Sequence, residues 1–340
     1  MTARAAAPLF LSHPSSAGHR TPAGHPERPE RMRAIEEALA ARAWEGHARA
    51  PAPRAGRAQL LAVHEAAHVE AVERAARAGG ALDGGETVAG PGSLEAALRA
   101  VGGACRLAEA LLAGDAPTGF CAMRPPGHHA GRAATSGFCL FNAVAAAAAH
   151  ARAALGAERV MIIDWDVHHG DGTADIFRDR CDVLYASIHQ AGIFPGTGPV
   201  TDVGVRGGEG HTINLPVPAG SAGDQWLSLL EWIIVPAGER FAPDLVLLSA
   251  GFDAHRDDPL AGCALDADDF AEMARHARDL GARVGAPVGA VLEGGYDLAA
   301  LAECVPATMR ALAGDRPASS VAADFLTERH AAHIGHWWRL

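Results

Sequence analysis

A run of side chains that commonly bind metal ions lies near the middle of the chain. In Asp164-Trp-Asp166-Val-His168, two carboxylates and one imidazole alternate with apolar residues, and Asp253 follows a second apolar stretch. On extended backbone, side chains two residues apart point to the same side. Carboxylates this close repel one another unless a cation balances them. Two carboxylates and one imidazole leave an open coordination position, so the pattern predicts a catalytic zinc site.

Short apolar stretches alternate with Ala-rich segments, and these are the elements that must position the ligands. We expect strands at 9–11, 119–122, 159–163, 183–188, 244–249 and 288–292. We expect helices at 27–43, 93–113, 142–155, 222–240 and 266–284. Nearly continuous apolar strands between helices indicate a parallel sheet with helices on both faces, an α/β fold.

Loops rich in Gly, Asp and His follow three of the expected strands. DWDVHHGDG follows 159–163, SAGFDAH follows 244–249 and EGGYD follows 288–292. In open parallel sheets, sites form beyond the carboxyl ends of the strands, so these loops predict one active site. No Pro-, Gly- or Ser-rich linker and no repeat divides the sequence, which favours a single domain over 1–340.

The composition excludes several classes of protein. The net charge is −11 and no Lys or Arg cluster offers a phosphate-binding face, so direct nucleic-acid binding is not expected. Residues 1–7 lack the apolar core of a signal peptide, and no stretch of about 18 apolar residues suggests a membrane span. The six cysteines are scattered without a CxxC pair, which is typical of a reduced cytoplasmic protein.

Five segments together closely resemble the zinc-dependent histone deacetylases. Within this family they are most similar to class II and its bacterial relatives, the histone deacetylase-like and acetylpolyamine amidohydrolases. The segments are RPPGHH (124–129), GFCLFN (137–142), DWDVHHGD (164–171), SAGFDAH (249–255) and EGGY (293–296). HPERP (25–29) and FPGTG (194–198) also match family signatures. The matches occur in order over about 25–300. The resemblance implies an arginase-like α/β fold with a mostly parallel eight-stranded sheet.

The resemblance also implies two metal ions. Asp166, His168 and Asp253 would be the zinc ligands. A structural potassium ion would be held, partly through backbone oxygens, by Asp164, Asp166, His168, Ser187 and Ile188. The donor set alone leaves the catalytic metal open, because two carboxylates and a histidine also suit Fe(II) or Co(II).

The catalytic groups implied by the resemblance are a histidine pair and a tyrosine. His128 would be oriented by Asp164, and His129 by Asp171. An imidazole that titrates near neutrality suits His129 to take a proton from water and deliver it to the leaving amine. His128 would stay charged and support the transition state electrostatically.

Tyr296 would donate its phenol proton to the developing oxyanion, and Gly294 and Gly295 would let the backbone turn it inward. The chain has only two tyrosines, and the other, Tyr185, lies within an expected strand. The position of Tyr296 directly after a Gly-Gly pair therefore favours a role in catalysis over simple packing.

The substrate channel is also implied by the resemblance. Phe138 and Phe194 match its aromatic walls, Gly137 would accept the substrate amide hydrogen through its carbonyl, and Arg28 would lie beneath the zinc. Acetylpolyamine specialists can carry an acidic residue seven positions beyond the third zinc ligand. Leucine stands there in this chain, and Leu260 favours lysine-type acyl amines over acetylpolyamines. The expected activity is hydrolysis of acetyl or short acyl amides of lysine-like amines, with acetylpolyamines as the alternative.

Two other classes are disfavoured. Binuclear manganese ureohydrolases need a second carboxylate two residues after Asp253, where this chain has His255. An inactive acyl-ligand binding module is expected to have lost a ligand, the histidine pair or Tyr296, and this chain retains them all. The last ten residues, 331–340, predict a helix that packs its tryptophans on the core, with a contact in a homo-oligomer as the alternative.

Overall fold

Eight strands form one sheet in the computed structural model, which describes residues 6–340. In chain order the strands are β1 (Leu9–Ser12), β2 (Ala48–Pro51), β5 (Thr118–Cys121), β6 (Val160–Asp164), β7 (Val183–Gln190), β8 (Thr212–Val217), β9 (Leu245–Ala250) and β10 (Val288–Leu292). The spatial order is β2-β1-β5-β10-β9-β6-β7-β8, and all seven neighbouring pairs are parallel. The expected eight-stranded α/β sheet is confirmed. The expectation for residues 1–7 falls largely on residues 1–5, which lie outside the described part.

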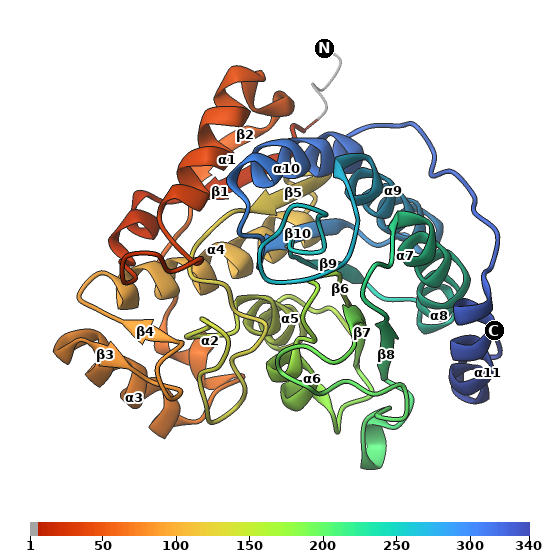
Figure 1. Cartoon of the computed structure of the whole chain (residues 1–340), viewed down its shortest axis with the longest axis horizontal. Coiled ribbons are helices and arrows are strands. Elements are labelled where there is room, and N and C mark those ends of the chain that lie inside the picture. Colours follow the sequence, from red (N-terminus) through yellow and green to blue (C-terminus); the bar gives the residue numbers. More distant parts are fainter. Residues whose placement is uncertain (1–5) are drawn as a thin grey trace.

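Helices cover both faces of the sheet (Figure 1). They are α1 (Glu30–Ala41), α2 (Arg57–Leu61), α3 (Ala66–Ala78), α4 (Ser93–Leu112), α5 (Ala143–Ala154), α6 (Asp171–Phe177), α7 (Gly223–Leu229), α8 (Val235–Phe241), α9 (Ala267–Val284), α10 (Leu298–Ala313) and α11 (Phe325–Trp338). Strand side chains alternate between two hydrophobic cores: Met161 and Ile163 face α1 and α7–α11, whereas Val160 and Ile162 face α2–α6.

The helices α2, α3, α6 and α10 were not among the expected elements, and the structure differs from the expectations in two further ways. The helix expected over 222–240 is divided into α7, a π-helical turn (Leu230–Ile234) and α8. Pro236, near the start of α8, has no N–H for the continuing helical bonds, which accounts for the break. The strands β2 and β8 were not expected. They form the two edges of the sheet, where proline is tolerated, and they contain Pro51 and Pro216.

The two ends of the molecule in Figure 1 carry a small hairpin and the C-terminal helix. The hairpin pairs β3 (Gly80–Ala81) with β4 (Val88–Ala89). In α11, Trp338 packs inward and donates from Nε1 to the Gly210 carbonyl at 2.7 Å, whereas Trp337 is 36% exposed. The expected packing thus holds for one tryptophan, and a subunit contact through this helix stays a prediction. No helix in the described part of the chain has the length and apolar character needed to cross a membrane.

Candidate metal and catalytic site

The loops after β6 and β9 bring together the three side chains expected to bind metal. The two strands are neighbours with Asp164 opposite Ser249, so residues just beyond both ends meet at one edge of the sheet. Ligand atoms of Asp166, His168 and Asp253 lie within 4.8 Å of one another, and all three residues are buried. The structure therefore assembles the expected Asp-His-Asp donor set.

The donor set fits a divalent cation. His168 Nδ1 lies 3.1 Å from Asp166 Oδ1 and 3.2 Å from Asp253 Oδ2. Burial disfavours the charged ring, but these carboxylates raise the pKa of His168 to about 10. Burial and the nearby Asp166 charge raise the pKa of Asp253. The site thus holds a positive charge tightly, and a metal bound there would replace the imidazole proton.

Backbone amides hold the carboxylates in place. Val167 N donates to Asp253 Oδ1 at 2.8 Å, and Gly294 N donates to Asp166 Oδ2 at 2.7 Å. Gly294 needs to be glycine for a steric reason: a Cβ there would overlap the Asp253 carboxylate and would lie 2.5 Å from Asp166 Oδ2. The loop after β10 therefore closes directly over two of the three candidate ligands.

The histidine pair lies on the loop after β5, with the two ring centroids 4.0 Å apart. His128 Nδ1 is 3.1 Å from Asp164 Oδ2, and His129 Nδ1 is 2.7 Å from Asp171 Oδ1. Each ring therefore contacts the carboxylate expected for it. These second partners fix which nitrogen of each ring faces the pocket.

The two imidazoles have opposite pKa shifts. Burial opposes the charged form of His128, but Asp166 and Asp164 together raise its pKa well above the usual value. Burial and the neighbouring His128 charge lower the pKa of His129 to about 4, despite its bond to Asp171. Of the two rings, His128 is therefore the one that favours the charged form, whereas His129 favours the neutral form. The pKa of His129 is therefore lower than the near-neutral value expected from the sequence.

A buried acceptor that was not expected from the sequence, Glu293, holds this loop. Glu293 Oε2 accepts from Gly127 N at 2.6 Å and from His128 N at 3.1 Å, and burial raises the pKa of Glu293 to about 7. Asp164 also accepts from the Tyr185 hydroxyl at 3.0 Å. Glu293 is the first residue of the EGGY segment, and this position near Tyr296 was the sequence signal that could have indicated a role in the site.

Tyr296 lies at the wall of the pocket. Two residues that support it, Asp258 and Arg31, were not predicted from the sequence. Its backbone N–H donates to Asp258 Oδ2 at 2.7 Å, and Asp258 Oδ1 also accepts from Leu260 N at 3.0 Å. The Arg31 guanidinium lies 4.9 Å from the centre of the Tyr296 ring. Gly295 has a φ of 109°, a conformation that favours glycine and that turns Tyr296 toward the site.

The prediction that Arg28 lies beneath the metal is wrong. Arg28 is exposed and precedes α1, whereas Arg31 is fully buried on the inner face of this helix. Arg31 donates to the carbonyls of Gly295 and Glu293, each at 2.6 Å, and pairs with buried Glu27 at 3.1 Å. The helical spacing of apolar residues in α1 was the sequence signal that could have shown that Arg31, and not Arg28, faces the protein interior.

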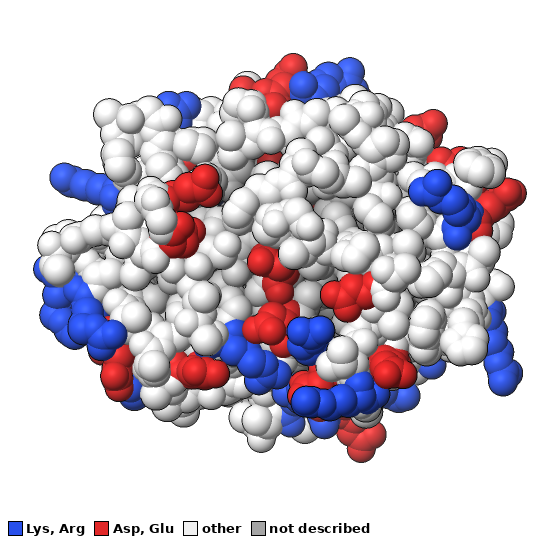
Figure 2. Space-filling model, turned by 60° about the horizontal axis from the view of Figure 1, so that its bottom comes forward, with Lys and Arg blue, Asp and Glu red and all other residues white. Residues whose placement is uncertain are grey.

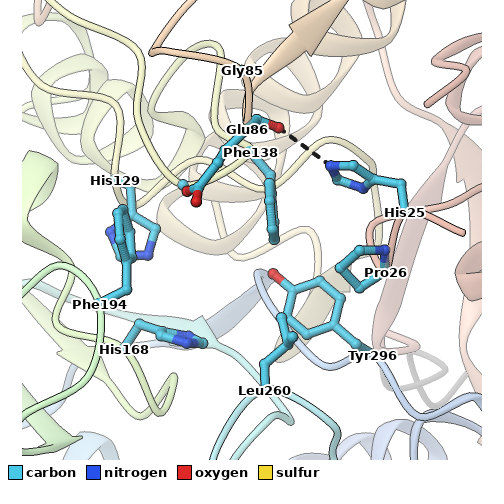
Figure 3. Close-up of a pocket in the computed structure, with 11 residues that line it drawn as sticks. His25, Pro26, Gly85, Glu86, His129, Phe138, His168, Phe194, Leu260 and Tyr296 are labelled. Carbon is cyan, nitrogen blue, oxygen red and sulfur yellow. Dashed lines mark hydrogen bonds between the residues drawn. The ribbon is translucent and has the colours of Figure 1, made fainter. Parts of the chain in front are cut away.

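An aromatic pocket of about 400 Å³ leads to these groups (Figure 3). Phe138 and Phe194 line it, with Leu260 at the rim and the Tyr296 hydroxyl pointing inward. The Phe194 ring centre lies 5.0 Å from that of His129. Gly137 also lines the pocket, and its carbonyl accepts from the Cys139 thiol at 3.3 Å. All the residues expected in the channel except Arg28 therefore surround one cavity.

The residues expected to hold potassium are also close in the fold. Asp164 and Ser187 are partners in the neighbouring strands β6 and β7, and Ile188 follows directly. These three residues are buried, as are Asp166 and His168. Ser187 Oγ lies 2.9 Å from His189 Nδ1. The potassium site stays a prediction based on the resemblance.

The comparisons with known proteins agree with this geometry. The model of a family described as "Histone deacetylase domain" matches residues 25–312. The chain belongs to the histone deacetylase family. A histone deacetylase-like amidohydrolase of Pseudomonas aeruginosa is 39% identical over 319 residues, which cover 92% of this chain and 84% of that protein.

Other family members show how far the similarity extends. Histone deacetylase 15 of Arabidopsis thaliana is 39% identical over 299 residues, 86% of this chain but only 53% of the plant protein. The chain thus spans about half the length of that relative. The crystal structure of the HDA15 HD domain superposes with a TM-score of 0.91 and 34% identity, and the match covers 99% of this chain and 96% of that one.

The described residues, 6–340, contain one group of three or more potential metal ligands within binding distance, namely Asp166, His168 and Asp253. His255, where a binuclear site would need a carboxylate, lies next to Asp257 and forms a β-bridge with Leu265. This histone deacetylase family member therefore offers the donors for a mononuclear centre.

Proposed function

We propose that this family member is a zinc-dependent deacetylase that hydrolyses acetyl or short acyl amides of lysine-like amines. The observation that carries the proposal is the buried Asp166-His168-Asp253 cluster beside a histidine pair with opposite pKa shifts, reached through an aromatic pocket. Such a pocket suits an extended aliphatic stem that ends in an amide.

The metal would be held by Asp166, His168 and Asp253. Zinc bound there would polarise the acyl carbonyl and acidify the attacking water. Iron(II) or cobalt(II) would suit the same donors, and the potassium site beside Ser187 would be structural. We propose the cytoplasm as the compartment, because all six cysteines are unpaired and five of them are buried.

The protein groups divide the proton transfers. Neutral His129 takes a proton from the attacking water and gives it to the leaving amine, and its lowered pKa favours release of that proton. Protonated His128 adds positive charge near the reacting carbonyl. The Tyr296 hydroxyl, which points into the pocket, donates to the oxyanion.

A substrate panel tests this proposal. The zinc-loaded protein should hydrolyse acetyl-lysine peptides, lose activity with a chelator and regain it with added zinc. Binding of these peptides without any turnover would favour an inactive acyl-ligand binding module. Leu260 predicts that lysine amides are preferred over acetylputrescine and acetylspermidine. A preference of about tenfold for either acetylpolyamine, or about 1.4 kcal/mol in transition-state binding, would refute the argument from Leu260.

A further inference from the structure

We propose that Glu86 forms a cation subsite at the mouth of the channel, which binds an ammonium or guanidinium group of the substrate. The inference rests on the deacetylase function proposed above and concerns which amines the channel accepts. Among the described residues that line this pocket, Glu86 is the one that carries a carboxylate. It lies on the β3–β4 hairpin, more than 170 residues before Leu260 in the sequence.

The hairpin fixes the backbone of Glu86 against the channel walls. His25 Nε2 lies 3.2 Å from the Glu86 carbonyl oxygen, and the His25 ring contacts the Phe138 ring edge-on, with centroids 4.7 Å apart. The next residue, Thr87, accepts a bond from Phe138 N at 2.9 Å and donates from its hydroxyl to Asp83 Oδ2 at 2.5 Å. The position of Glu86 is therefore coupled to an aromatic wall of the channel.

The carboxylate itself is available to a ligand. In residues 6–340, no hydrogen bond or ion pair involves the Glu86 side chain, whereas other exposed carboxylates such as Glu70 and Glu239 pair with arginine. In Figure 3 the carboxylate extends over the pocket, on the side where Phe138 and Phe194 lie. Glu86 therefore sits where the part of a substrate beyond the aliphatic stem would emerge.

The surroundings of Glu86 strengthen its field. Phe138, Phe194, Leu260 and Pro26 supply apolar walls, which screen charge less than water does. The whole chain has a net charge of −11, which favours the approach of cations, although acidic and basic side chains both lie on the face shown in Figure 2. Three exposed arginines line a separate hollow on the other side of His25 and are absent from the channel lining: Arg20, Arg28 and Arg33.

Glu86 and Leu260 would then select for different features. The apolar Leu260 contacts the stem and disfavours a charge placed beside it, while Glu86 attracts a charge that lies outside the channel. Two kinds of substrate offer that charge: an acetylpolyamine with its second amine, or an acetyl-lysine peptide with a neighbouring arginine. Both sources share the same chemistry, so the test has one arm for each.

The test measures charge selectivity with matched substrate pairs. The small-molecule arm compares N-acetylputrescine with the neutral N-pentylacetamide. The peptide arm compares acetyl-lysine peptides with arginine or glutamine next to the modified lysine. We expect Glu86→Gln to lower the kcat/KM ratio of the cationic to the neutral substrate by about threefold to fivefold at low salt, and less at high salt. The ratio is the readout, so any effect of the substitution that is common to both substrates cancels.

Glu303→Gln is the matched control, because Glu303 is exposed on α10 and does not line the channel. It removes the same charge from the protein and should leave both ratios unchanged. Equal ratios in wild type and Glu86→Gln, in both arms, would overturn the subsite, as would an equal effect of Glu303→Gln. A change in one arm alone identifies the source of the cation. Absence of turnover with every acyl amide would instead overturn the deacetylase function.

Discussion

The close approach of Gly294 to two candidate ligands predicts that Gly294→Ala weakens metal binding. The added Cβ would lie 2.5 Å from Asp166 Oδ2 and would overlap the Asp253 carboxylate, whereas real Cβ atoms stay at about 3.0 Å or more. One or both carboxylates must therefore move by roughly half an ångström or more. Disturbing the groups that orient a metal ligand lowers the affinity for the metal by about 10- to 100-fold. Overpacking adds about 1–3 kcal/mol of lost stability.

Competition with a chromophoric zinc chelator measures the affinity directly. Urea unfolding with and without excess zinc gives a second readout, because each tenfold loss of affinity removes about 1.4 kcal/mol of the stabilisation by zinc. Gly90→Ala is the matched control, since a Cβ at Gly90 meets no atom within 4 Å. Wild-type zinc affinity in Gly294→Ala would refute the steric argument, and so would equal losses in the two variants.

Three further predictions test the residues around the metal cluster and the buried histidines. Tyr296→Phe should keep zinc but lose about 100-fold or more in kcat, because it removes one donor to the oxyanion; near-normal kcat would remove Tyr296 from the mechanism. Arg31→Met should lower the free energy of unfolding by about 3 kcal/mol, because it leaves buried Glu27 with one partner fewer, while exposed Arg28→Met should change it by less than about 0.5 kcal/mol; equal effects in urea unfolding would contradict the reassignment. Burial lowers the pKa of His64 to about 3, so the unfolded chain takes up the proton first as pH falls below about 6.5, and stability falls from there toward pH 3. His64→Gln should reduce the loss of stability between pH 7 and pH 5 by about 1–2 kcal/mol, and an unchanged pH slope would refute this assignment.

The central strands and the metal ligands could be predicted from the sequence for a simple physical reason. β6 and β9 are buried on both faces, so they are continuous apolar runs, and their polar residues begin where each strand ends. The alternation in Asp164-Trp-Asp166-Val-His168 marked the candidate ligands, although β6 ends at Asp164 and residues 166–168 form a bend instead of the extended backbone expected. The edge strands β2 and β8 gave no such signal, because one is largely exposed and both contain proline.

The supporting groups were harder to predict, because their partners are distant in sequence. Arg31 contacts Gly295 across 264 positions, and the choice between Arg28 and Arg31 depends on where α1 begins. Asp258 and Glu293 bind backbone N–H groups, which any residue type supplies, so no sequence pattern marks the contact. The place of Glu86 at the channel depends on how the β3–β4 hairpin folds against Phe138, which local sequence does not encode.

The order of strands in the sheet has a consequence for how the protein matures. The histidine pair follows β5, Tyr296 follows β10, Asp253 follows β9, and Asp166 and His168 follow β6, and these four strands are adjacent in space. The groups come from positions 128 to 296, so a partly synthesised chain that ends before β9 lacks a ligand, and one that ends before β10 lacks the strand between the others. A metal site made of Asp166, His168 and Asp253 would therefore be complete only after β9 and the loop that follows it have been synthesised, so the proposed metal would bind late.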